Sequence, residues 1–178
     1  MLVTLIAHTN DPEKTIAAAA KLCYSDAHIE TLLDGLTPEK TAAFLQKLND
    51  FGHASPIEHA SFTFGIEGVS RTFLAQVTRH RIASFSVQSQ RYVRLEDFRY
   101  VIPPEIEADP AAKAAFIDAM NADAKHYLEL VKALEEKHTH TLMEQGMSEK
   151  TARAKASKMA NEDARFVLPN ACETKMVM

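Results

Sequence analysis

The sequence has few cysteines, no long apolar run and no internal repeats. Its two cysteines, Cys23 and Cys172, are too few for a disulfide framework and lack metal-ligand spacing, so no metal site is expected. Both are predicted to be buried free thiols in a reducing compartment. The apolar run at residues 2–7 is far too short to span a bilayer, and no secretory signal pattern accompanies it. These absences predict a cytoplasmic protein without a membrane partner.

Positive charge is also scarce. The chain has 20 Lys and Arg against 24 Asp and Glu, which gives a formal net charge of -4. The molecule as a whole therefore does not attract polyanions, and no nucleic acid is expected as a partner. Any phosphate binding must come from a local cluster of basic side chains. With 178 residues, 46% of them hydrophobic, and no linker or low-complexity tract, the sequence predicts a single domain over residues 1–178.

Hydrophobic periodicity predicts an α+β fold, with a small antiparallel or mixed sheet and long helices. Strands are expected at residues 2–7, which should be buried, and at residues 62–67, where apolar and polar residues alternate. Helices are expected over residues 12–23, from residue 38, over 70–78, from 110 towards 146, and from 149 towards 165. The start signals are Asp11, Thr37, Asp109 and Ser148.

Two polar segments interrupt this pattern. Residues 52–59 form a turn with proline inside it, which should not be helical throughout. Residues 84–91 contain three serines, which are poor choices inside a helix, so an extended or looped segment is expected.

The stretch from Gln76 to Arg91 has the strongest functional pattern. It places Arg79, His80, Arg81 and Arg91 among hydroxyl and amide side chains. Arginine presents planar donors that suit phosphate oxygens, and serine hydroxyls can complete such a cradle. The competing interpretation is a solvated charged face after a helix. The residue chemistry alone leaves the two interpretations about equally supported.

Three motifs give this sequence a family resemblance. Arg79-His80-Arg81, followed by seven residues and then Ser89, resembles the signature of the flavin-dependent thymidylate synthases. The segment from His53 to His59 is similar to that family's His-x-Ser/Thr-Pro-x-Glu-His element, and residues 164–169 are similar to its Ala-Arg-x-x-Leu-Pro segment. Together the motifs extend the resemblance over nearly the whole chain.

The resemblance implies an enzyme that makes dTMP from dUMP. Methylenetetrahydrofolate would donate the carbon, and NADPH would supply electrons through a tightly held FAD. The family assembles as homotetramers with shared active sites, so the same is expected here.

The resemblance also implies roles for individual residues. Ser89 is interpreted as a phosphate ligand and not as a nucleophile, because a serine nucleophile needs an adjacent base. His53 and Ser25 are possible accessory residues. The residues implied to contact FAD are Ser55, Glu58, Arg79, His80, Arg81 and Val87. The residues implied to hold dUMP are Gln76, Arg79, Val87, Gln88, Ser89, Gln90, Arg91 and Arg165.

The sequence departs from the family pattern in two places. Val87 stands where many members have Glu or Gln, which removes a polar side chain near flavin and nucleotide but leaves the backbone available. The family's later Asn-x-Arg-Ser-Leu motif, and the arginine after it that polarises the uracil ring, have no counterpart before Met178. A longer native chain is therefore expected, and no residue of this sequence is assigned as catalytic.

Two other functions are compatible with the same residues. One is a non-catalytic module that binds a nucleotide or flavin through the arginine cluster. The other is a flavoprotein relative that binds the cofactor without methylating a substrate.

Overall fold

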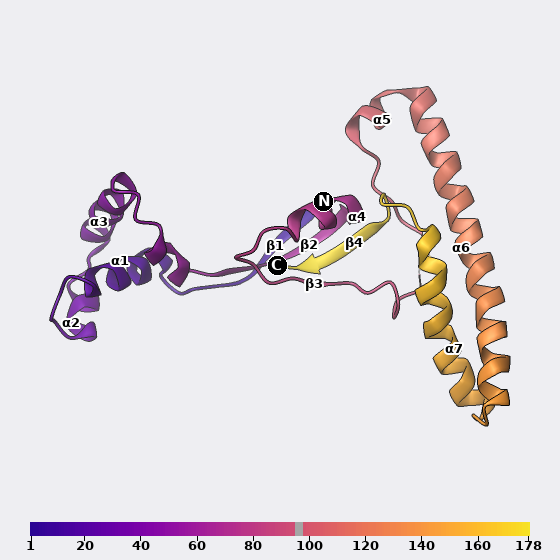
Figure 1. Ribbon diagram of the computed structural model, residues 1–178. Coiled ribbons are helices and arrows are strands. Elements are labelled where there is room, and N and C mark those ends of the chain that lie inside the picture. The colour runs from indigo at the N-terminus through magenta and orange to yellow at the C-terminus, as the bar shows by residue number, and fades with distance from the viewer. Residues whose placement is uncertain (95–97) are drawn as a thin grey trace. The chain divides into compact units, whose positions relative to one another are not determined.

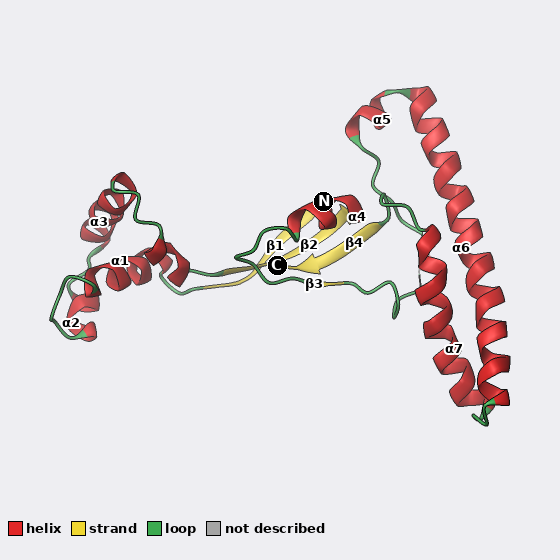
Figure 2. Cartoon of the chain, viewed as in Figure 1, coloured by secondary structure: helices red, strands yellow, loops and turns green. Residues whose placement is uncertain are grey.

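The computed structural model describes residues 1–94 and 98–178, which form two compact units (Figure 1). One unit comprises residues 3–65, and the other comprises residues 1–2 and 66–178. Their elements are shown by type in Figure 2. In chain order they are β1 (Leu2–His8), α1 (Pro12–Leu22), α2 (Ile29–Asp34), α3 (Pro38–Asp50), the 3₁₀ helix η1 (Ser55–His59), β2 (Phe62–Ser70), α4 (Arg71–Val77), β3 (Ser86–Val87), α5 (Pro104–Ala108), α6 (Pro110–Glu144), α7 (Glu149–Ala164), the 3₁₀ helix η2 (Arg165–Val167) and β4 (Glu173–Val177).

The strands form one small sheet in the order β1-β2-β4-β3. Strand β3 pairs antiparallel with β4, so that Ser86 lies opposite Val177 and Val87 lies opposite Met176. The predicted α+β class with long helices is confirmed. The sequence analysis missed β4 and α2, which are both short and carry no extended periodic pattern.

The unit of residues 3–65 is a small helical cluster with a two-stranded extension. Helix α1 packs against α2, α3 and η1 through an alanine-rich surface that buries Ala17 and Ala20. Thr37 caps α3 as predicted, because its hydroxyl accepts a hydrogen bond from the Lys40 amide at 3.4 Å. The predicted cap at Asp11 is wrong. Asp11 has a left-handed backbone with φ of 48°, and its side chain makes no capping bond.

Strand β1 is present where it was predicted, but the expectation that it would be buried is wrong. Each of its residues is exposed, including Leu5 at 48% and Ile6 at 57%. The strand lies at the edge of the sheet, beside β2 alone, which explains the exposure. The apolar side chains of β1 are therefore not packed into a core of the described residues.

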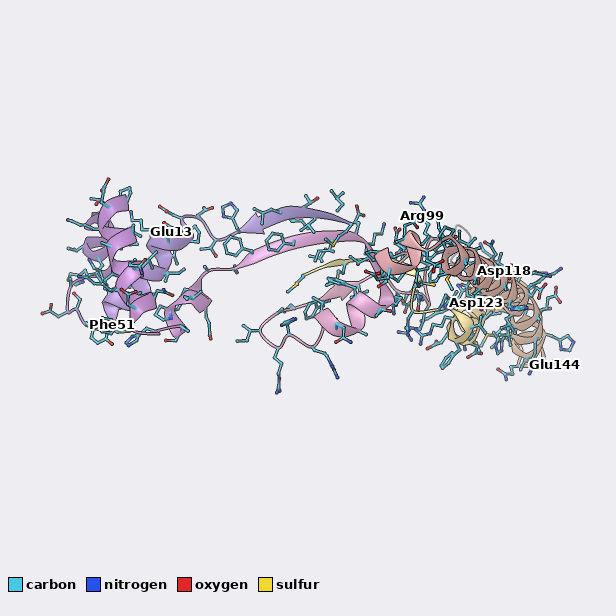
Figure 3. All side chains as sticks on the ribbon, turned by 90° about the horizontal axis from the view of Figure 1, so that it is seen from above. Glu13, Phe51, Arg99, Asp118, Asp123 and Glu144 are labelled. Carbon is cyan, nitrogen blue, oxygen red and sulfur yellow. The ribbon has the colours of Figure 1, made fainter. Side chains whose placement is uncertain are left out.

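The unit containing residues 66–178 is organised around the hairpin of α6 and α7. Asp109 caps α6 by accepting bonds from the amides of Ala111 and Ala112 at 2.9 and 3.1 Å. The hairpin turns at Gly146, whose φ of 90° favours glycine, and Ser148 then caps α7. Figure 3 labels Asp118, Asp123 and Glu144 along α6.

Small residues on α7 allow the two helices to pack closely. Four alanines of α7 recur every fourth position and are almost fully buried. Three of them contribute to two apolar clusters, Ala164 to one with Tyr127 and Val131 of α6, and Ala152 and Ala156 to one with Leu142. The buried alanines are Ala152, Ala156, Ala160 and Ala164.

Within the described residues, no helix is both long and apolar enough to cross a membrane.

The two cysteines differ in environment. Cys172 is fully buried, but Cys23 is exposed just after α1, so the expectation of a buried thiol is wrong there. Cys23 is the C-cap residue of α1, in the connection that leads to α2. Both thiols are free. Burial raises the pKa of the Cys172 thiol to about 11, and the nearby Arg71 cation only partly offsets this effect.

We predict that Ellman's reagent at pH 8 modifies Cys23 rapidly and Cys172 only after denaturation. The exposed thiol is accessible, whereas the buried thiol stays protonated. The variant Cys23→Ser should show no rapid phase. A rapid phase in that variant would contradict the assignment.

The folded state holds the Cys172 proton more tightly than the unfolded chain does. The contribution of this proton to the free energy of unfolding is therefore constant below about pH 8 and is lost as the pH rises from about 9 towards about 11.

Candidate phosphate site

The Arg-His-Arg motif lies in a turn at the end of α4. Helix α4 ends at Val77, and the amides of Arg79 and His80 then donate to the carbonyls of Gln76 and Val77 at 3.2 and 3.1 Å. Figure 3 shows nitrogen-tipped side chains of this loop standing away from the ribbon. Within the described residues, neither arginine of the motif forms an ion pair with a carboxylate. Arg79, His80 and Arg81 are all exposed, as is Gln76 on α4.

Pairing with β4 fixes the segment that follows. Val87 is half-buried opposite Met176, and the next amide, that of Gln88, donates to the carbonyl of Lys175 at 3.0 Å. The segment of residues 84–91 is thus extended and then looped, as predicted. The strand pairing determines where the half-buried residues Ser89, Gln90 and Arg91 begin their turn.

Ser89 organises this turn. Its carbonyl accepts a bond from the Val93 amide at 3.1 Å, and its hydroxyl oxygen accepts one from the Arg91 amide at 3.3 Å. Because the hydroxyl oxygen is the acceptor in that bond, its own hydrogen remains available for an anion. This arrangement suits a phosphate ligand.

The side chains of Arg91 and Arg165 both contact Glu162, which lies in the last turn of α7. The Arg91 Nη1 lies 3.2 Å from Oε1 of Glu162, in a partly exposed ion pair. The Nε of Arg165 donates to the backbone carbonyl of Glu162, also at 3.2 Å. Arg91 and Arg165, which lie far apart in the sequence, therefore contact the same residue at the C-terminal end of α7, and Ser89 belongs to the turn that carries Arg91.

Arg71 is a further arginine of this region, and the sequence analysis did not single it out. Burial lowers the pKa of its guanidinium; the Cys172 thiolate would raise that pKa, and the Arg165 cation lowers it further. Arg71 therefore lies close enough to Arg165 for the two positive charges to repel each other. A single arginine at the start of a short helix carries no pattern that could have revealed it from the sequence.

The other predicted cofactor residues belong to the unit of residues 3–65. Ser55 and Glu58 are exposed on η1, and His53 is exposed beside the Phe51 ring at 6.2 Å. The Ser25 hydroxyl accepts a bond from the Ala27 amide at 3.2 Å and faces a hollow of about 230 Å³. These residues and the arginine cluster belong to different units. A shared site therefore stays a prediction.

A larger groove lies on the α6–α7 hairpin. Its volume is about 560 Å³, and its lining includes Arg94, Lys132, Glu135 and Arg153. None of the residues predicted to bind FAD or dUMP lines it. Among residues 1–94 and 98–178, no group of three or more His, Cys, Asp or Glu side chains is placed to hold a metal ion.

Similarity to known proteins extends along almost the whole chain. The family model described as thymidylate synthase complementing protein matches residues 4–178. The flavin-dependent thymidylate synthase of Clostridium tetani is 50% identical over 175 residues, which cover 98% of this chain and 67% of that protein. The protein of the same name from Geobacter sulfurreducens is 43% identical over 180 residues, covering 100% of this chain and 67% of that protein. The chain spans about two thirds of the length of these relatives.

Solved structures share the fold. The UMP/dUMP methylase PolB from Streptomyces cacaoi, bound with 5-Br dUMP, superposes with a TM-score of 0.69 at 18% identity over 99% of this chain and 70% of that chain. The flavin-dependent thymidylate synthase ThyX from Helicobacter pylori, complexed with FAD and dUMP, gives a TM-score of 0.56 at 23% identity over 99% of this chain and 77% of that chain. At these identities the likeness concerns the fold.

The family match and the sequence identities agree with the three motifs. The matched residues 4–178 include the Arg-His-Arg motif, the upstream His53 to His59 element and the Ala-Arg-x-x-Leu-Pro segment. The resemblance predicted from these motifs is confirmed by relatives that are 43% to 50% identical. The chain belongs to the flavin-dependent thymidylate synthases, the family whose model is described as thymidylate synthase complementing protein.

Proposed function

We propose that this protein methylates dUMP to dTMP, with Ser89, Arg91 and Arg165 holding the nucleotide phosphate. The observation that carries this proposal is that Arg91 and Arg165 both contact Glu162 at the end of α7, while the Ser89 hydroxyl accepts a bond from the Arg91 amide. A guanidinium has five N–H donors, and one from each arginine contacts Glu162 in the structure. Each arginine therefore has donors left for a dianionic phosphate. Family membership supports the same substrate, because the Helicobacter pylori relative was solved with dUMP.

FAD is the proposed cofactor, with NADPH as reductant and methylenetetrahydrofolate as carbon donor. The donor set fits a flavin dinucleotide, because Arg79, His80 and Arg81 are exposed cations or donors and the FAD pyrophosphate is an anion. Ser55 and Glu58 are proposed to contact FAD as well, with His53 and Ser25 as accessory residues. When bound, FAD supplies the hydride chemistry.

The residues of this chain are proposed to bind and orient the reactants. Gln76, Gln88 and Gln90 offer amide groups that can contact the nucleotide. Val87 offers only its backbone, because its side chain is apolar and half-buried beside β4. Positioning of this kind lowers a reaction barrier by removing translational and rotational freedom before the reaction.

We also propose a homotetramer with shared active sites, located in the cytoplasm. The exposed apolar residues of β1 support assembly, since the exposed fractions are 50% for Val3, 48% for Leu5 and 57% for Ile6. The two free thiols fit a reducing compartment. One family model matches across both units, which supports a single functional domain.

A non-catalytic module using the same arginine cluster is the alternative. It is not favoured, because the relatives that are 43% to 50% identical are named as thymidylate synthases.

The first test is the colour of the purified protein. We expect a flavin absorbance spectrum, bleaching by NADPH, and formation of dTMP from dUMP when methylenetetrahydrofolate is added. Colourless protein that cannot be reconstituted with FAD would contradict the proposal. Bleaching without any dTMP would instead indicate a flavoprotein that does not methylate.

The second test is Arg91→Ala. We expect dUMP affinity to fall at least tenfold while flavin stays bound, because a charge-assisted hydrogen bond contributes about 1.5–3 kcal/mol. The measurement is the dissociation constant of dUMP by titration calorimetry. Arg153→Ala is a control, since Arg153 lies near the start of α7, away from the turn of residues 89–91, and forms its ion pair with Glu149 at 2.9 Å. Equal dUMP affinity in Arg91→Ala and the unmodified protein would refute the phosphate assignment.

A further inference from the structure

The turn that carries Ser89 and Arg91 is attached to α7 by a buried side chain. Asn161 is only 4% exposed. Its Nδ2 donates to the backbone carbonyl of Arg91 at 3.5 Å, and its Oδ1 accepts a bond from Nε of Arg94 at 3.4 Å. Both bonds therefore go to the segment that contains the phosphate ligands.

Arg94 extends this attachment to both helices of the hairpin. Its Nη2 lies 2.5 Å from Oε2 of Glu135 on α6 and 3.0 Å from Oγ of Ser157 on α7. The side chains of Arg94 and Glu135 are 29% and 31% exposed, against 42% for Arg91. The Arg94 ion pair is thus more sheltered from solvent than the Arg91 ion pair. Less solvent screening makes such a pair more sensitive to the loss of a partner.

The spacing along α7 links this attachment to the phosphate ligands. Ser157 and Asn161 lie four residues apart on one face of α7, and Arg165, the C-cap residue of that helix, follows four residues later. Glu162, the partner of Arg91, is next to Asn161. One helix face therefore fixes the turn through Asn161 and presents Arg165 beside it.

The two apolar clusters of the hairpin do not include Asn161. The α6–α7 interface is formed by apolar clusters around Tyr127 with Val131 and around Leu142 with Ala152 and Ala156. Asn161 makes its two side-chain bonds outside these clusters, to Arg91 and Arg94. A change at Asn161 should therefore release the turn before it disrupts the helices.

We propose that Asn161 and Arg94 are positioning residues that hold Ser89 and Arg91 at the spacing required by the nucleotide phosphate. This inference rests on the proposed function, because it takes the phosphate of dUMP as the ligand of Ser89 and Arg91. Neither positioning residue needs to touch the substrate. Ligands held by supporting hydrogen bonds lose little freedom on binding, and small displacements of such groups weaken binding strongly.

The test compares two variants at Asn161 in the full-length, FAD-loaded protein. Asn161→Ala removes both bonds and should raise the dissociation constant of dUMP about tenfold. Asn161→Asp keeps an acceptor for Arg94 but places an oxygen against the Arg91 carbonyl, so it should weaken dUMP binding at least as much. In both variants KM for dUMP should rise, while kcat at saturating dUMP and the flavin content should change less than about twofold.

Controls separate this effect from a general loss of structure. Thr139→Ala alters another buried polar residue of the hairpin, 9% exposed, and should leave dUMP affinity unchanged. If Asn161→Ala unfolds, Asn161→Asp still tests the contact with Arg91, because it retains the side-chain volume and the Arg94 bond. Unaltered dUMP affinity in Asn161→Asp overturns the proposal, and so does a fall in kcat with KM unchanged.

Arg91→Ala distinguishes failure of this inference from failure of the proposed function. If Arg91→Ala weakens dUMP binding and the Asn161 variants do not, only the positioning role is wrong. If Arg91→Ala also leaves dUMP binding unchanged, the phosphate assignment fails and the positioning role fails with it.

Discussion

Close packing of α7 against α6 is the constraint on which the candidate phosphate site depends. Alanines at every fourth position of α7 bury a narrow apolar surface against Tyr127, Val131 and Leu142. That packing fixes the rotation of α7 and so decides which of its side chains face the neighbouring turn. Asn161 and Glu162 contact Arg91 in the turn of residues 89–91 because the alanine face is packed against α6. A helix free to rotate could not hold Asn161 and Glu162 against Arg91.

Electrostatic balance in the site follows from this arrangement. The protein carries a formal net charge of -4, yet Arg71, Arg91 and Arg165 lie near the same end of α7. Glu162 offsets part of the mutual repulsion by accepting bonds from two of these arginines through its side chain and its backbone. The site is thus a local cationic region within an acidic molecule, which favours a small dianion over an extended polyanion.

Particular elements show what sequence reasoning could predict. The capping residues Thr37, Asp109 and Ser148 were identified correctly, because a cap depends on a side chain and amides within one turn. Strand β1 was placed correctly, but its burial was not, since exposure depends on which strands and chains lie beside it. Asp11 resembles a cap in sequence, yet its backbone is left-handed and its side chain makes no capping bond. β4 was missed because five residues carry too little pattern.

The sequence by itself determined the family and the α+β class, because motif spacing and periodicity are properties of the chain alone. Only the tertiary structure decided that Arg91 reaches Glu162 beside Arg165, that Arg71 lies near Arg165, and that Asn161 bonds to Arg91 and Arg94. The contacts of Arg91 and Arg94 with α7 join residues about 70 positions apart, as in the bond between Asn161 and Arg91 at a separation of 70. Local sequence cannot encode such proximity, because it results from the packing of α6, α7 and the sheet.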